Sequence, residues 1–70
     1  MSKYDDWDTG EALGWTQNDE PLYLALQARK HSRARFCAYL WEWLVENGRA
    51  LGIRRSKVNM GQVYKDFITE

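Results

Sequence analysis

The sequence is poor in cysteine, histidine and proline, and each shortage excludes a class of protein. Among 70 residues there is one cysteine, Cys37, one histidine, His31, and one proline, Pro21. A single cysteine cannot close an intramolecular disulfide, and one cysteine with one histidine cannot supply a zinc site. The N-terminus lacks the charged and then apolar organisation of a signal peptide. We therefore expect a cytoplasmic protein that holds no metal and no other cofactor.

Long apolar runs and an excess of one charge are also missing. The longest apolar stretch, Phe36 to Val45, is ten residues long and contains Glu42. About 20 residues are needed to cross a bilayer, so no membrane association is predicted. Ten basic and ten acidic side chains give a formal net charge of zero. This balance argues against a protein that binds nucleic acid or membranes by charge alone.

The charges are nevertheless unevenly distributed along the chain. Residues 1–20 carry six acidic side chains against one lysine, whereas residues 21–58 carry eight basic side chains against two glutamates. An acidic front and a basic middle could attract each other or attract different partners. The distribution therefore points to binding through charged surfaces.

Arrangements of side chains that perform catalysis are absent. Cys37 and His31 are six residues apart, so on a single helix they would face different ways. With a break between them a catalytic pair is not excluded but has no support, and a buried structural cysteine with a surface histidine is favoured. Glu42 and Glu46 are spaced as paired carboxylates, but a solvated stripe on a helix explains them better. Glycine-rich phosphate loops do not occur. We expect no catalytic residues, no small-molecule substrate and no enzymatic activity.

Helix-start signals are the clearest local patterns in the chain. Asp19 precedes Pro21, a proline placed where a helix needs no backbone donor, and Ser32 could cap a second helix after a break. Asn59 has the position of an N-cap, with Gln62 as its reciprocal partner in a capping box. Together with apolar residues at helical spacing, these signals predict an all-α protein, a small three-helix bundle with helices at about 19–31, 33–51 and 57–69.

Residues 1–18 show no helical or strand periodicity. They contain two glycines and the isolated tryptophans Trp7 and Trp15. We predict that they form an irregular acidic arm attached to a helical domain of residues 19–70. Trp7 in this arm is a candidate contact to a basic partner surface, because tryptophan is common at interface hot spots.

The predicted central helix is apolar over an unusually wide part of its circumference. One face carries core candidates such as Phe36, Leu40 and Leu44, whereas Trp41 and Val45 fall well outside that face. Two further helices cannot cover all of these residues. Trp41 and Val45 are therefore predicted to form an interface with a partner protein or with a second copy in a homodimer.

Residues 48–58 resemble the turn region of helix-turn-helix DNA-binding proteins. The residues that match that pattern are Gly48, Leu51, Gly52, Ile53 and Val58. The resemblance implies a recognition helix that presents side chains suited to phosphates and base edges, namely Arg54, Arg55, Lys57, Asn59 and Gln62. A basic run further upstream offers additional phosphate contacts through Arg29, Arg33 and Arg35. A helix that begins at the Asn59 cap would instead leave residues 54–58 in a loop, and the two interpretations compete.

Two functions follow from these features. The first is a small DNA-binding or DNA-associated regulator that uses the helix-turn-helix-like segment. The second is a protein-binding inhibitor or adaptor that uses exposed aromatic residues, for example a small virus-encoded protein directed at host machinery.

Overall fold

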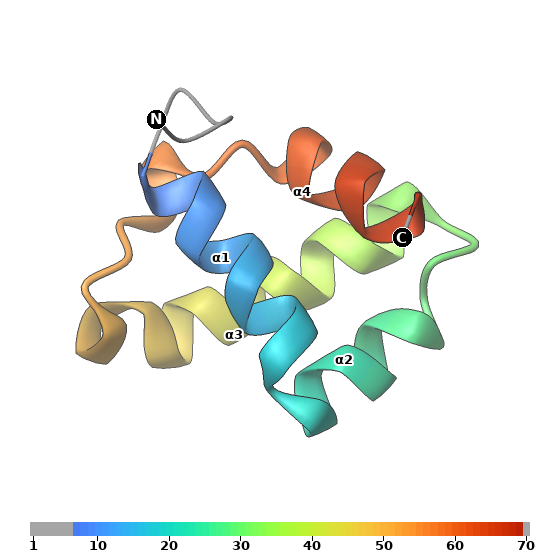
Figure 1. Ribbon diagram of the computed structural model, residues 1–70, viewed down its shortest axis with the longest axis horizontal. Coiled ribbons are helices and arrows are strands. Elements are labelled where there is room, and N and C mark those ends of the chain that lie inside the picture. The colour runs from blue at the N-terminus through green and yellow to red at the C-terminus, as the bar shows by residue number, and fades with distance from the viewer. Residues whose placement is uncertain (1–6, 70) are drawn as a thin grey trace.

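Four α-helices and one short 3-10 turn make up residues 7–69, the part of the chain that the computed structural model describes (Figure 1). The elements are α1 (Trp7–Asn18), α2 (Glu20–Gln27), α3 (Arg33–Leu51), the 3-10 turn η1 (Arg55–Lys57) and α4 (Met60–Ile68). Helix α1 crosses in front of the long α3, with α4 above them and α2 below. The predicted all-α fold is confirmed. None of the helices within residues 7–69 combines the length and the apolar character that crossing a bilayer requires.

Helix α1 replaces the irregular arm that the sequence predicted for residues 7–18, so the bundle contains four helices and not three. Its buried side chains recur at helical spacing and are Asp8, Thr9, Ala12, Leu13 and Thr16. Three of these five are polar, so the buried face carries no apolar periodicity that the sequence could reveal. The first six residues of the predicted arm lie outside the described residues.

The two caps predicted around α2 are confirmed. The Asp19 carboxylate accepts a hydrogen bond from the Leu22 N–H at 3.1 Å, and the Ser32 hydroxyl accepts one from the Arg35 N–H at 3.3 Å. Helix α2 is shorter than predicted because it ends at Gln27, and a turn connects it to α3. The break before Ser32 therefore lets α3 turn back across the molecule.

Helix α3 ends in a Schellman motif, in which two backbone bonds close the last turn. The N–H of Ile53 donates to the Gly48 carbonyl at 2.8 Å, and the N–H of Gly52 donates to the Arg49 carbonyl at 3.2 Å. Gly52 has a φ of +75°, which favours glycine. A Cβ atom on Gly48 would lie 3.0 Å from the Ile53 carbonyl oxygen. The geometry of this turn therefore favours glycine at both positions.

Helix α4 begins at Met60 and not at residue 57, because Asn59 caps it. The Asn59 side-chain oxygen accepts a hydrogen bond from the Gln62 N–H at 3.1 Å, as predicted. The reciprocal bond expected of Gln62 does not form. Instead, the Gln62 side chain donates to Asp66, and the Asn59 N–H donates to the Thr9 hydroxyl oxygen at 2.9 Å. The N-cap is thus completed by a residue of α1.

The core lies where the inner faces of the four helices meet. Phe36 of α3 is fully buried and packs edge-on against Tyr64 and Phe67 of α4, with both ring centroids 5.0 Å away. Further buried residues come from every helix and from the α3–α4 connection, and they are Ala12, Leu13, Leu22, Leu26, Leu40, Leu44, Ile53, Val58 and Val63. A second aromatic contact joins Trp15 of α1 to Trp43 of α3 at 6.2 Å.

Candidate functional site

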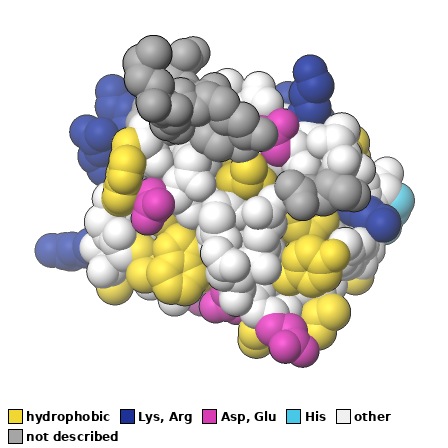
Figure 2. Space-filling view, in the orientation of Figure 1, with side chains coloured by type: hydrophobic (Ala, Val, Ile, Leu, Met, Phe, Trp, Pro, Cys, Tyr) yellow, Lys and Arg dark blue, Asp and Glu magenta, His cyan; other side chains and the backbone are white. Residues whose placement is uncertain are grey.

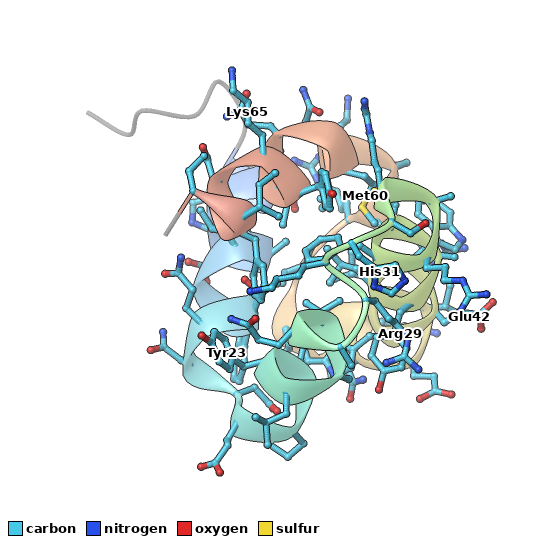
Figure 3. All side chains as sticks on the ribbon, turned by 90° about the vertical axis from the view of Figure 1, so that its right-hand side faces the viewer. Tyr23, Arg29, His31, Glu42, Met60 and Lys65 are labelled. Carbon is cyan, nitrogen blue, oxygen red and sulfur yellow. The ribbon has the colours of Figure 1, made fainter. Side chains whose placement is uncertain are left out.

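The outer side of α3 is not covered by any other helix of the described chain. Trp41 is 40% exposed and Val45 is 46% exposed, and they are one helical turn apart. Figure 3 shows Glu42 pointing outward from α3 on the side away from α1. This exposure follows from helix geometry, because Leu40 and Leu44 point into the core and their successors in the sequence are rotated by 100°. The predicted exposure of Trp41 and Val45 is confirmed.

A groove lies beside Trp41, between the C-terminal half of α3 and η1. We call it the tryptophan–arginine groove; it has a volume of about 570 Å³ and is lined by Trp41, Leu44, Arg49, Gly52, Ile53, Arg54, Arg55 and Ser56. Leu44 and Ile53 are buried and form its apolar floor, whereas the three arginines are exposed. Figure 2 shows lysine and arginine side chains gathered at the left edge of the molecule, where α3 ends and η1 lies in Figure 1.

The three arginines of the groove differ in their partners. The Arg54 guanidinium pairs with the buried Asp8 carboxylate at 2.9 Å, although 68% of the Arg54 side chain remains exposed. The Arg55 guanidinium carbon lies 5.4 Å from the centroid of the Trp41 ring, within the range of a cation–π contact. No carboxylate of residues 7–69 lies within ion-pair distance of Arg49 or Arg55. These two charges are therefore available to an external anion.

Hydrogen bonds to α1 fix the turn that carries Arg54 and Arg55. Asp8 accepts a hydrogen bond from the Arg54 backbone N–H at 2.8 Å, and the Thr9 hydroxyl lies 3.4 Å from the Lys57 carbonyl oxygen, to which it donates. Val58, directly after η1, is buried in the core. The turn that carries Arg54 and Arg55 is therefore anchored at both ends.

The remaining basic residues of the predicted nucleic-acid surface lie at the other end of α3. Arg35 and Arg49 are 14 residues apart on this helix, which corresponds to about 21 Å. Arg29 lies at the α2–α3 junction, over the Tyr39 ring at 4.3 Å, and donates to the Ala25 carbonyl (Figure 3). The Arg33 guanidinium lies over Gly61 near the start of α4. The structure therefore splits the predicted basic residues into two groups and does not form one continuous surface.

The recognition helix implied by the helix-turn-helix resemblance is not formed. Gly52 adopts a positive φ, and Ile53 and Val58 face the core, which agrees with the turn of such a motif. However, Arg54 to Lys57 precede α4 and do not belong to it, because the Asn59 cap starts the helix at Met60. Asn59 and Gln62 were expected to contact bases. Instead, the Asn59 side chain accepts a hydrogen bond from the Gln62 backbone N–H, and the Gln62 side chain donates one to Asp66. The competing interpretation from the Asn59 cap is therefore correct.

Two residues of this region were missed by sequence reasoning. Arg49 lies in the last turn of α3 and gave no signal, because a basic residue at the end of a helix is common for electrostatic reasons. Asp8 is 46 residues from Arg54 in the sequence, and nothing local distinguishes it from the other acidic residues of the predicted arm. Trp7, by contrast, is the first residue of α1, is 57% exposed and does not line the groove, so its role at an interface stays a prediction.

Cys37 and His31 lie in different environments. Cys37 is half-buried on α3, with its sulfur 3.9 Å from the Met60 carbonyl oxygen, whereas His31 is exposed in the turn before α3 (Figure 3). Within residues 7–69, no three His, Cys, Asp or Glu side chains come close enough together to hold a metal ion.

Comparison with known proteins finds no match to this chain among models of protein families, curated proteins or solved structures. The feature with the most distinct chemistry is the tryptophan–arginine groove together with the neighbouring Val45.

Proposed function

We propose that this protein is a small non-enzymatic protein-binding module, an inhibitor or adaptor that docks its partner on the outer side of α3. The observation that carries this proposal is the exposure of Trp41 beside three arginines in one groove, with Val45 exposed one helical turn from Trp41. Tryptophan and arginine are the residue types that most often dominate the binding energy of protein interfaces. An apolar centre with a charged rim is also the usual anatomy of such an interface.

The charges around the groove favour a protein partner over DNA. Glu42 and Glu46 are exposed on α3, each next to one of the two exposed apolar residues, and they would repel a polyanion lying along this helix. Val45 offers nothing to a phosphate backbone but would pack against an apolar side chain. The formal net charge of zero agrees with this preference.

DNA binding is the second candidate, and one observation favours it. Arg49, Arg54, Arg55 and Lys57 are exposed within a short distance in the sequence, and Trp41 beside them could stack on a base. Such a site would act without a recognition helix. It would therefore bind with little sequence specificity and with a steep dependence on salt.

Affinity purification from an extract of the native host tests the proposal. Tagged wild-type protein is compared with Trp41→Ser and with Leu24→Ser, which removes an even more exposed apolar side chain from α2. Each extract is run with and without nuclease, and retained proteins are quantified by mass spectrometry. We expect wild type and Leu24→Ser to retain a protein that Trp41→Ser does not, independently of nuclease. Retention that disappears with nuclease would contradict the proposal and support the DNA candidate.

A further inference from the structure

We propose that the tryptophan–arginine groove binds an acidic segment of the partner, with its carboxylates between Arg49 and Arg55 and an apolar side chain on Trp41. This inference rests on the proposed function and names the chemistry of the partner.

The charges of the groove are complementary to those of an acidic segment. Arg49 and Arg55 have no carboxylate within ion-pair distance among residues 7–69, yet they line the same groove. Arg54 uses its Nη2 atom for Asp8, while a guanidinium has five N–H donors and most of this side chain stays exposed. Planar guanidinium groups match carboxylates with two parallel hydrogen bonds. The groove therefore offers several donors to a small number of carboxylates.

An apolar surface accompanies the charges of the groove. Leu44 and Ile53 form the floor of the groove, and Trp41 forms one wall. Val45 continues the apolar surface one helical turn further along α3. A ligand with charge alone would leave this surface exposed to water. A peptide segment that combines acidic and apolar side chains would cover both parts.

The groove is preorganised for binding. Arg55 already lies over the Trp41 ring, and Asp8 holds the backbone and the side chain of Arg54. The Schellman turn and the buried Ile53 fix the chain on the other side of the groove. Binding would therefore order few additional side chains, and this reduces the entropy lost on association.

A second copy of this chain fits the groove less well than a different protein. In a symmetric dimer across the groove, each patch would face itself, so the arginines of one copy would approach those of the other. Such like charges are unfavourable when they are brought together. An acidic segment avoids this repulsion, and Glu42 and Glu46, which lie between Trp41 and Arg49 in the sequence, do not line the groove.

The test uses a display library of random twelve-residue peptides selected against the immobilised full chain. We expect the enriched peptides to combine Asp or Glu with Trp, Phe or Leu. Their affinity for the wild type is measured by fluorescence anisotropy and compared with that for Arg55→Glu, Arg49→Glu and Trp41→Ser. Each variant is first checked by circular dichroism for a folded helix content and a cooperative melt.

Lys57→Glu is the matched control, since it makes the same charge change on the same turn but at a residue that does not line the groove. We expect Arg55→Glu and Arg49→Glu each to weaken binding about 10-fold or more, and Lys57→Glu to weaken it about 3-fold or less. Equal losses for Arg55→Glu and Lys57→Glu would overturn the groove as the site, because they would indicate attraction by net charge alone.

The remaining outcomes separate this inference from the proposed function. Enriched peptides that are neutral or basic but still require Trp41 would overturn the acidic partner and leave protein binding intact. No enrichment, or enrichment that Trp41→Ser leaves unchanged, would overturn both. A single-stranded twelve-nucleotide thymidine probe that displaces the selected peptides and binds more tightly than they do would overturn both in favour of nucleic acid.

Discussion

Asp8 and Arg54 are 46 residues apart in the sequence and are joined twice in the structure. One carboxylate oxygen of Asp8 accepts from the Arg54 backbone N–H at 2.8 Å, and the other accepts from the guanidinium at 2.9 Å. The Asp8 side chain is fully buried, whereas that of Arg54 is mostly exposed. This pair ties α1 to the turn that carries two arginines of the groove. The N-terminal helix therefore contributes to the geometry of the candidate site without lining it.

Removing the Asp8 carboxylate should destabilise the protein and weaken peptide binding together. Asp8→Ala leaves the buried side of Arg54 without these acceptors, which costs about 2 kcal/mol of unfolding free energy and lowers Tm by about 8–16 °C. Asp19→Ala, which removes only the cap of α2, should cost about 1 kcal/mol and leave peptide affinity unchanged. Thermal melts and anisotropy titrations measure both effects. A melting temperature of Asp8→Ala equal to that of wild type would show that the pair has no structural role.

Two glycines with equal space around them should respond oppositely to alanine. A Cβ atom on either Gly14 or Gly52 would meet no atom within 4 Å. Gly14 lies inside α1, so Gly14→Ala should stabilise the protein by about 0.5–1 kcal/mol through helix propensity. Gly52 has a φ of +75°, so Gly52→Ala should destabilise it by about 1–2 kcal/mol. Urea denaturation gives both values, and a destabilised Gly14→Ala would contradict the helical assignment of residues 7–18.

Two neighbouring tryptophans of α3 should separate binding from stability. Trp43 is half-buried against Trp15, so Trp43→Ser should cost about 2–3 kcal/mol of unfolding free energy. Trp41 is exposed and contacts Arg55, so Trp41→Ser should cost about 1 kcal/mol or less. Of the two variants, Trp41→Ser alone should abolish partner binding while the protein stays folded. If Trp41→Ser unfolds the protein instead, Trp41 belongs to the core and the interface argument fails.

Two buried threonines of α1 should differ in how much their hydroxyl groups stabilise the protein. The Thr9 hydroxyl accepts from the Asn59 N–H and lies within hydrogen-bond distance of the Lys57 carbonyl, so Thr9→Val should cost about 1–2 kcal/mol. The Thr16 hydroxyl donates only to the Leu13 carbonyl of its own helix, and Thr16→Val should change the free energy of unfolding by less than about 0.5 kcal/mol. Hydrogen exchange at the Asn59 amide provides a local measurement. Faster exchange is expected in Thr9→Val, and equal exchange rates in both variants would contradict this account.

Much of the helical structure could be read from short stretches of sequence. The caps at Asp19, Ser32 and Asn59 depend on one side chain and a backbone N–H three residues later, so the signal is complete within a single turn. The inner face of α3 and the exposure of Trp41 and Val45 follow from helical periodicity in the same way. Local geometry was therefore sufficient for these features.

Helix α1 and the groove could not be predicted in this way. Asp8 and Thr9 are buried because Arg54 and Asn59, far away in the sequence, satisfy their hydrogen bonds, and no pattern within α1 reports that pairing. The groove likewise requires Arg49 and Trp41 on one helix to meet Arg55 on a separate turn. The sequence by itself determined where most helices begin and which side of α3 is apolar, because those interactions are local. Only the tertiary structure decided that residues 7–18 are helical and that the exposed tryptophan lies beside three arginines, because both depend on contacts between distant segments.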